Sequence, residues 1–205
     1  MTTKECILNE SLELFSVSGY EAVSMRDIGK AVGIRESSIY KHYSGKQAIL
    51  DEIVAKAMGE IDHMLVELQV PDPNLDASVA NYLNMSFEDI AKLCTDMLLK
   101  QRSNPLVAKF RRLLTIEQYR NETLRKIYIE NFMERQLAYN EKVFAYLLKL
   151  GVLRGTSAQM MSLEFYAPFF MLQYRMTDEE EKLEEALQEY VIHFLREHLK
   201  EEETK

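Results

Sequence analysis

The stretch Ser24–Lys46, SMRDIGKAVGIRESSIYKHYSGK, has the pattern of two short helices joined by a glycine turn. Ser24 and Asp27 stand three residues apart, a spacing at which the serine hydroxyl caps the first helical turn and the acid faces its positive end. An apolar face at helical spacing follows: Ile28, Ala31 and Val32. Gly33 then stands where the chain must turn with a positive φ, so the first helix is predicted to end there.

A second helix is predicted directly after this turn, with Ile34 and Ile39 as its buried points. Its outward arc is polar and contains Arg35, Glu36, Ser37, Ser38, Lys41 and His42. Two cations, short hydroxyls and a carboxylate that can accept from a cytosine amino group suit a DNA groove. Ser44 and Gln47 repeat the capping-box spacing, so another helix is predicted to begin straight after the second.

This segment resembles the DNA-binding region of the tetracycline-repressor (TetR) family of bacterial transcription regulators. The matching features occur in order: an amphipathic helix ending at Gly19-Tyr20, then Ser24-Met25-Arg26-Asp27-Ile28, Ala31-Val32-Gly33-Ile34, and Ile39-Tyr40-Lys41-His42-Tyr43 closed by Lys46. That ordered set is far more specific than a helix-turn-helix periodicity alone. Family members often have Ser, Thr or Ala where Arg35 stands, so we expect a different cap and different bases read here.

The resemblance implies roles for individual residues. The positions that grip phosphates in the family correspond to Tyr40, His42 and Lys46, with Ser24 and Arg26 near the start of the preceding helix. The candidates for contact with base edges are Arg35, Glu36, Ser37 and Lys41, and Ser38 suits either role. For any single residue a solvated helix face is about as good an interpretation, but for the whole set it is not.

Composition favours an all-α fold. The chain has 205 residues, 47% of them hydrophobic, with seven glycines, four prolines and no tryptophan. No apolar run approaches the roughly 20 residues of a membrane span, and the N-terminal MTTKECILNE carries an acid where a signal peptide is basic. We therefore expect a cytoplasmic protein without membrane contact. Cys6 and Cys94 are isolated and are interpreted as buried or half-buried thiols.

The charge is unevenly distributed along the chain. Residues 1–50 carry six Lys/Arg and six Asp/Glu, so the net charge of −8 lies in the remaining residues. Within Ser24–Lys46, five basic residues face two acidic ones. A small cationic patch on an acidic body is drawn to phosphate at one end only, which discourages non-specific coating of DNA.

Two domains and about nine helices are predicted: a three-helix helix-turn-helix domain over residues 1–50 and a helical ligand-binding and dimerisation domain over residues 51–205. Thr2 and Glu5 cap the first helix, which Gly19 ends. The later helices are predicted over residues 44–69 and 74–101, then as a short helix after the break at residues 102–105, and over residues 119–150, 157–176 and from Thr177 onward. Residues 157–176 are apolar almost all round, so that helix must be covered on two sides.

The last two helices are expected to pair with their copies across a two-fold axis. The resemblance implies the same: in the TetR family these helices form the dimer, and those before them enclose an inducer pocket. The expected partners are thus a second copy of the chain, a palindromic operator in double-stranded DNA and a small-molecule inducer that releases a repressor from it.

The candidates for the inducer pocket are large side chains on the helices that would surround it: Met97, Phe110, Leu114, Tyr119, Phe132, Tyr139, Phe165 and Phe169. Each of them is individually better interpreted as core packing. Glu164 lies within the apolar run, where a carboxylate needs a partner. That partner is Arg175, Arg135 or a cationic ligand.

Catalytic and metal sites are not expected. Glu60 and His63 have the Glu-x-x-His spacing of di-iron bundles, but the sequence has no second copy of that motif. His193 and Glu197 are i, i+4 partners on a polar face, with no nucleophile or Gly-rich phosphate loop beside them. We therefore expect no cofactor and no enzyme activity. Two alternatives remain: a regulator whose body docks a protein, and a helical small-molecule-binding enzyme that kept the N-terminal domain.

Overall fold

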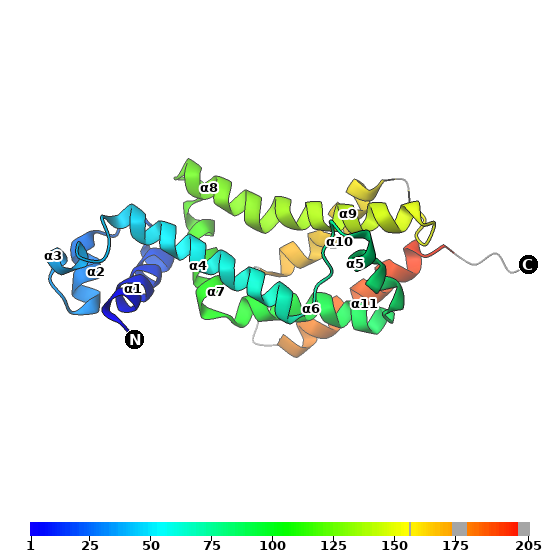
Figure 1. The fold of residues 1–205 in the computed structure, drawn as a ribbon, viewed down its shortest axis with the longest axis horizontal. Coiled ribbons are helices and arrows are strands. Elements are labelled where there is room, and N and C mark those ends of the chain that lie inside the picture. The colour runs from blue at the N-terminus through cyan, green and yellow to red at the C-terminus, as the bar shows by residue number, and fades with distance from the viewer. Residues whose placement is uncertain (156, 174–179, 201–205) are drawn as a thin grey trace, which may run out of the picture. The chain divides into compact units, whose positions relative to one another are not determined.

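The structure, a computed structural model, describes residues 1–155, 157–173 and 180–200. They are predominantly helical, and no β-strand occurs among them (Figure 1), so the predicted all-α fold is confirmed. By contacts the chain divides into two compact units, Met1–Met64 with Gln101–Ile129 and Leu65–Lys100 with Glu130–Lys205. The predicted domain boundary between residues 50 and 51 does not coincide with the boundary between these units, and it stays a prediction.

The first unit contains the N-terminal helices and two later ones. Its elements are α1 (Thr3–Ser18), α2 (Met25–Val32), α3 (Glu36–Ile39), most of α4 (Lys46–Glu67), α7 (Pro105–Glu117) and α8 (Glu122–Ile129). In Figure 1, α1 to α3 lie around the N-terminal end of α4. We call residues 1–50 the head.

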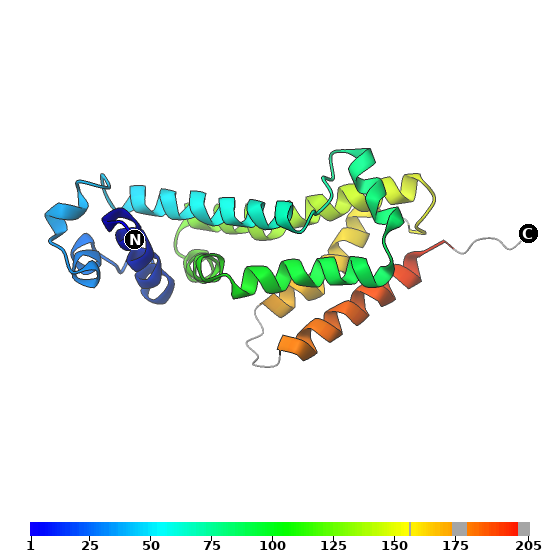
Figure 2. The same cartoon turned by 60° about the horizontal axis from the view of Figure 1, so that its bottom comes forward.

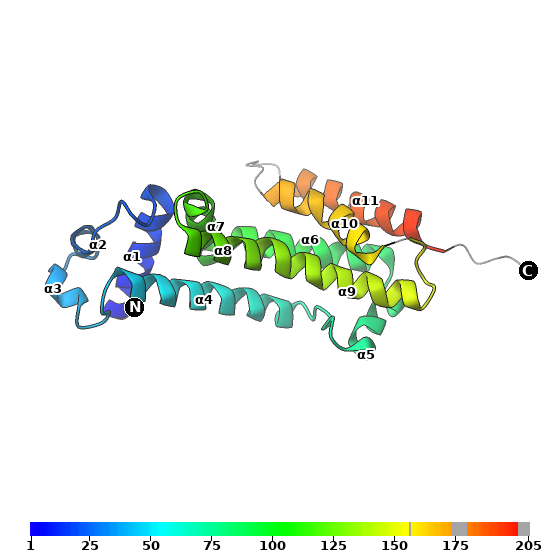
Figure 3. The same cartoon turned by 90° about the horizontal axis from the view of Figure 1, so that it is seen from above.

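The second unit contains the remaining elements: α5 (Asp76–Val79), a 3-10 helix (Ala80–Asn84), most of α6 (Phe87–Ser103), a π-helical segment (Glu130–Glu134), α9 (Arg135–Lys149), α10 (Ala158–Gln173) and α11 (Glu180–His198). Helix α10 packs against both α9 and α11 (Figures 2 and 3). Among the described residues, no helix has the length and apolar character required to span a membrane.

The helices of the head begin where their caps predict. The Thr2 hydroxyl accepts from the backbone N–H of Glu5, whose carboxylate accepts from the Thr2 N–H at 2.7 Å. Ser24 and Asp27 form the same reciprocal pair at the start of α2. Each box satisfies two of the backbone donors that a helix start leaves free.

Two glycines shape the connection from α2 to α3. Gly33 caps α2 in the left-handed conformation, with φ +77°. Gly29 lies inside α2, where its carbonyl accepts from the Ile34 N–H at 2.9 Å. A Cβ on Gly29 would come within 2.9 Å of the Ile34 carbonyl oxygen, which is backbone. The chain therefore folds back tightly only because residue 29 has no side chain.

The head has an apolar core. Helix α1 contributes four buried apolar side chains to it: Ile7, Leu8, Leu12 and Phe15. It is joined by Ile28 of α2, Ile39 of α3, and Ile49 and Ile53 of α4, all fully buried. Helix α2 buries Met25, Ile28 and Gly29, whereas Ala31 is exposed and Val32 is half-buried. The buried residues of α2 therefore lie about one helical turn earlier than the predicted set.

Aromatic rings form the centre of the second unit. Phe165 of α10 lies 5.0 Å from Phe194 of α11 and 5.6 Å from Phe144 of α9, measured between ring centroids. Both contacts are edge-to-face, the arrangement that aligns a ring's positive edge with the negative face of another. Phe169 and Tyr190 extend the cluster. Three helices are therefore held together mainly by buried ring surface.

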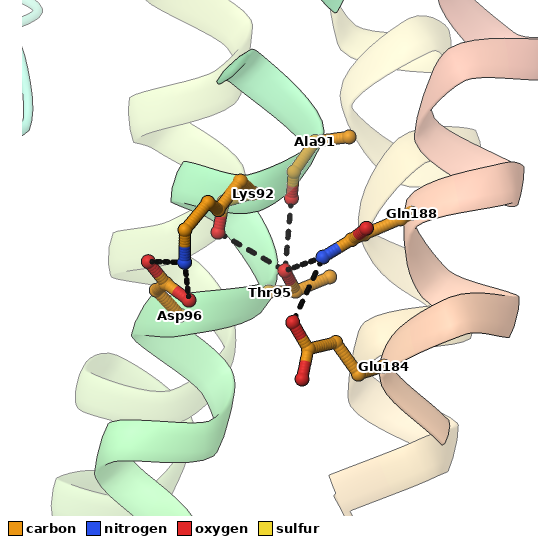
Figure 4. Close-up of polar contacts among 6 residues, drawn as sticks. All are labelled: Ala91, Lys92, Thr95, Asp96, Glu184 and Gln188. Carbon is orange, nitrogen blue, oxygen red and sulfur yellow. Dashed lines mark hydrogen bonds and ion pairs between the residues drawn. The ribbon is translucent and has the colours of Figure 1, made fainter. Parts of the chain in front are cut away.

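A smaller polar joint links α6 to α11 (Figure 4). The buried Thr95 hydroxyl bonds to the carbonyls of Ala91 and Lys92 in its own helix and accepts from Gln188 Nε2 at 3.4 Å. Gln188 Nε2 also donates to Glu184 Oε1 at 2.9 Å. The contact that crosses between the helices is long, so we expect it to contribute little to stability.

Three predicted elements differ from the structure. The helix expected over 74–101 is divided, because residues 76–84 form a short α-turn and a 3-10 helix before α6 begins at Phe87. The helix expected over 119–150 contains the π-helical segment Glu130–Glu134. Gln47 bonds to the Tyr20 hydroxyl and to Asp51 instead of serving a capping box with Ser44. The expected helix start at Thr177 lies outside the described residues.

Replacing Gly29 with alanine is expected to destabilise the protein by about 1–3 kcal/mol, because the new Cβ would displace the backbone at Ile34. Gly59 is the matched control, since it lies in α4 and a Cβ placed there would meet no atom within 4 Å. Gly59→Ala should stabilise by about 0.5–1 kcal/mol through helix propensity. Urea unfolding followed by circular dichroism measures both, and equal effects would contradict the close-approach argument.

Truncating Phe165 should cost far more than removing the Thr95 hydroxyl. Phe165→Ala removes ring contacts with four neighbours and is expected to cost about 3–5 kcal/mol. Thr95→Val keeps the side-chain shape and loses the long bond from Gln188 together with the hydroxyl's bonds to carbonyls of its own helix, so about 1 kcal/mol is expected. The same unfolding measurement compares them. A Thr95→Val cost as large as that of Phe165→Ala would mean that the polar joint, not the rings, holds these helices.

Candidate nucleic-acid interface

Helix α3 is the element that presents the predicted reading residues. It is a single turn, Glu36–Ile39, and the chain continues in turns in which the N–H groups of His42 and Tyr43 donate to the Ile39 carbonyl. The predicted second helix is thus shorter than expected. Arg35 occupies the N-cap position without a side-chain cap bond, which confirms the expectation of an unusual start. Its guanidinium is therefore not used to cap the helix.

The structure places most of the predicted DNA-contacting side chains at the surface. Those classed as exposed are Ser24, Arg26, Arg35, Glu36, Ser37, Tyr40, Lys41 and His42, while Ser38 and Lys46 are half-buried. Tyr40 is 52% exposed, so its side chain is accessible to a binding partner. Ile39, in the middle of this segment, is fully buried and fixes which side faces out.

Ser24 and Asp27 have structural tasks at the start of α2. The Ser24 hydroxyl accepts from the Asp27 N–H at 3.2 Å and also bonds to the Asp27 carboxylate. Two hydrogen bonds to the Asp27 carboxylate hold its pKa below the usual value. The bond from the Ser24 hydroxyl has the larger effect, and the bond from the Ser24 N–H has the smaller one. A phosphate contact by Ser24 would therefore have to share a hydroxyl that is already bonded.

Lys46 is engaged inside the head. Its ammonium donates to the carbonyls of Tyr20 at 2.8 Å and Val23 at 3.1 Å, and lies 4.3 Å from the centre of the Tyr20 ring. These acceptors belong to the turn between α1 and α2. The geometry thus gives Lys46 a role in fixing this turn, whereas the sequence resemblance had suggested only a phosphate contact.

Sequence reasoning missed two residues that support the interface. Gly29 allows the tight return between α2 and α3, and only the close approach of the Ile34 carbonyl reveals it. Glu117 of α7 is fully buried and accepts from the Tyr20 N–H at 2.8 Å. No local pattern indicates a contact between residues 97 positions apart.

The candidates for an inducer pocket are divided between the two units. Phe110 and Leu114 are fully buried in the first unit. In the second unit Phe132, Phe165 and Phe169 are buried, and Met97 and Tyr139 are half-buried. The Tyr139 hydroxyl donates to the Pro71 carbonyl at 2.9 Å and bonds to the Tyr82 hydroxyl at 2.7 Å. Burial raises the pKa of Tyr139 to about 12.

Two of the predicted pocket residues lie at the surface. Tyr119 is 88% exposed because α7 ends at Glu117 and the apolar spacing no longer applies beyond it. The Glu164 side chain is 61% exposed, and its carboxylate lies 3.8 Å from His198 Nε2. The expectation that Glu164 needs a buried partner was therefore wrong. Arg135 is exposed, and Arg175 lies outside the described residues.

The Glu60 carboxylate, which has the spacing of a metal ligand, accepts from the Asn104 amide at 3.0 Å. Within the described residues, no group of three or more His, Cys, Asp or Glu side chains is arranged to hold a metal ion.

Comparison with known proteins adds to this geometry. Residues 7–53 match the family model described as "Bacterial regulatory proteins, tetR family". Among curated proteins, the chain is similar to IcaR of Staphylococcus aureus (strain Newman), the HTH-type negative transcriptional regulator of the biofilm operon icaADBC. The two are 29% identical over 63 residues, which cover 31% of this chain and 34% of IcaR. The match thus spans about a third of that relative.

Solved structures match along almost the whole chain. A putative TetR-family transcriptional regulator from Mesorhizobium loti superposes with a TM-score of 0.64 at 18% identity, covering 97% of both chains. AibR, in complex with isovaleryl coenzyme A and operator DNA, superposes with a TM-score of 0.66 at 14% identity, covering 92% of this chain and 97% of AibR. At these identities the superpositions establish a shared fold.

The family match, residues 7–53, contains the capping box at Ser24, the glycine turn and the exposed face of α3. The helical arrangement beyond it is also that of solved TetR-type proteins. The N-terminal segment of this protein is thus similar to the bacterial regulatory proteins of the tetR family, and its fold is shared with solved TetR-family regulators.

Proposed function

We propose that this protein is a homodimeric transcriptional repressor that binds a palindromic operator and leaves it when a small molecule binds. The exposed polar face of α3 and the turn after it, Arg35 to His42, is the observation that carries the proposal. This face is supported by a buried Ile39 and by the close packing at Gly29, so the backbone that carries it has a fixed direction. Its site of action would be DNA in the cytoplasm.

The two kinds of DNA contact divide along this face. Arg35, Glu36, Ser37 and Lys41, with Ser38 in either role, are proposed to reach base edges. Tyr40 and His42, with Ser24 and Arg26 from α2, are proposed to contact phosphates. Lys46 is proposed to support phosphate binding chiefly by holding the turn between α1 and α2, because its ammonium already bonds to that turn.

An uncovered apolar stripe on α10 supports the dimer. Met160, Leu163 and Met171 are 60%, 52% and 65% exposed, although the opposite face of the same helix is buried. A helix that is apolar almost all round requires cover on both faces. The α10 and α11 helices of a second copy would provide it in a four-helix interface. Two heads in a dimer could then read half-sites about 34 Å apart.

The proposal that a ligand releases the protein from DNA is based on the TetR family and on one protein of similar structure. AibR has been solved with isovaleryl coenzyme A and operator DNA together. For this chain, the interior aromatic side chains of the second unit, Phe132, Tyr139, Phe165 and Phe169, are the proposed surroundings of a small molecule. Such a ligand acts by binding more tightly to the form that does not bind DNA, since only differential affinity shifts an equilibrium.

A gel-shift assay of the purified protein on its own upstream intergenic DNA tests the proposed function. It uses two salt concentrations and an excess of random DNA as competitor. Competitor-resistant retardation with a palindromic footprint is the expected result. A folded, dimeric protein that shows no specific shift on this DNA or on other upstream fragments would contradict the proposal and favour a body that docks another protein.

Substitutions on the α3 face should separate base contacts from phosphate contacts. Arg35→Ala or Lys41→Ala is expected to change the preference among operators with single base-pair replacements, by about 1–3 kcal/mol at one position. Tyr40→Ala should weaken binding to all of them alike and leave the salt dependence unchanged, because its neutral hydroxyl releases no counterion. Fluorescence anisotropy measures these affinities. Lys56→Ala removes a comparable charge from α4 and should leave both properties unchanged; unchanged binding in all three test variants would rule out this face.

A charge placed on the α10 stripe should break the dimer. Leu163→Glu and Met160→Glu put a carboxylate where a second copy would have to bury it unpaired, which is strongly unfavourable. Sedimentation velocity should then show monomers at concentrations where the parent protein is dimeric. Val66→Glu makes the same change at an α4 position that is 77% exposed, and should leave the dimer intact. Dimers that persist in both α10 variants would place the interface elsewhere.

A further inference from the structure

The turn between α1 and α2 is held from one side by a buried acid of α7. The Tyr20 N–H donates to Glu117 Oε1 at 2.8 Å, and Glu117 is fully buried while Tyr20 is 7% exposed. A backbone N–H enclosed in this way must find an acceptor inside the protein. Glu117 is that acceptor for Tyr20.

Gly19 makes room for this carboxyl group. Its φ is +85°, and a Cβ at this position would lie 2.6 Å from Glu117 Oε1. A side chain on residue 19 would therefore force either the turn or the carboxyl group to move. The glycine that ends α1 thus also makes a close contact between α1 and α7 possible.

Lys46 holds the same turn from the other side. Its ammonium donates to the Tyr20 carbonyl at 2.8 Å and to the Val23 carbonyl at 3.1 Å. The N–H of Tyr20 thus meets an acid from α7, while its carbonyl meets a cation from α4. Both bonds involve a group of the type that makes strong hydrogen bonds in a low-dielectric interior.

The turn leads directly into the reading elements. Val23 is buried, and the next residue, Ser24, is the N-cap of α2. A shift of residues 19–23 would therefore change where α2 begins and, through the close contact at Gly29, where α3 points. A second contact between α7 and α1 lies at the surface, where Lys109 Nζ is 2.6 Å from Glu13 Oε2.

The other carboxyl oxygen of Glu117, Oε2, does not explain why this residue is an acid. Among the described residues Oε2 has no hydrogen-bond partner, although it is buried. Burying a polar oxygen without a partner costs stability, so an apolar side chain here would pack at lower cost. The advantage of an acid at this position is therefore the bond that it makes to the Tyr20 N–H.

We propose that Glu117 is a positioning residue for DNA binding: together with Lys46 it clamps the turn between α1 and α2 and so sets the direction in which α3 is presented. This inference rests on the proposed DNA-binding function. It makes α7, distant in sequence from the head, a part of the machinery that aligns the reading face.

Three variants test the clamp in the full-length protein. Glu117→Met removes the acceptor, Glu117→Asp keeps the carboxyl group but shortens its reach, and Glu117→Gln keeps an acceptor oxygen at the same reach. Glu10→Met is the control, because Glu10 is an exposed residue of α1. The readouts are amide hydrogen exchange at Tyr20, operator affinity per active protein, and the salt dependence of that affinity.

In Glu117→Met, exchange at Tyr20 should rise at least about tenfold, and operator affinity should fall about tenfold with a lower salt dependence. Glu117→Gln should rescue all three readouts, and Glu10→Met should change none of them. A purely structural role would lower the melting temperature without altering the affinity or salt dependence of the folded fraction. Glu117→Asp takes the place of Glu117→Met if the latter does not fold.

Parental exchange, affinity and salt dependence in folded Glu117→Met and Glu117→Asp would overturn the proposal. Failure of the underlying function gives a different result. If the parent protein binds no DNA specifically, the proposed function fails, whereas exchange at Tyr20 in the same variants still shows whether the clamp exists. Unchanged exchange there would reject the clamp on its own.

Discussion

The backbone groups of the turn between α1 and α2 impose the constraint on which the head depends. Tyr20 is buried, so its N–H and carbonyl groups must be satisfied by the protein and not by water. Glu117 supplies the acceptor and Lys46 the donor, one from α7 and one from α4. The three N-terminal helices are therefore completed by a helix far along the chain, and the compact unit that contains them includes residues 101–129.

The reading helix depends on its surroundings even more strongly. A single helical turn such as α3 gains too little from its own hydrogen bonds to form alone. Its position follows from three contacts: the buried Ile39, the left-handed Gly33, and the backbone approach between Gly29 and Ile34. Because these contacts are fixed before any DNA arrives, the backbone of α3 needs little ordering when its outer face binds.

Sequence patterns predicted the features that depend on contacts between residues close together in the chain. The capping boxes at Thr2 and Ser24 and the turn at Gly33 involve residues a few positions apart, and the structure confirms them. The inward turn of Lys46 and the burial of Glu117 depend on contacts between distant segments, which one sequence does not reveal. The error at Glu164 has a related cause. An apolar run suggests burial on every side, but one face of α10 is open in the single chain.

The inward Lys46 changes the electrostatic argument for selectivity. Within Ser24–Lys46 the exposed basic residues are Arg26, Lys30, Arg35 and Lys41, and Lys30 lies 3.8 Å from the Asp27 carboxylate. Sequence-independent affinity grows with the number of phosphates that a protein neutralises. With so few cations available and a net charge of −8 on the chain, that contribution is small. Tight binding would then require base contacts, so the arrangement favours a selective reader over a general DNA-coating protein.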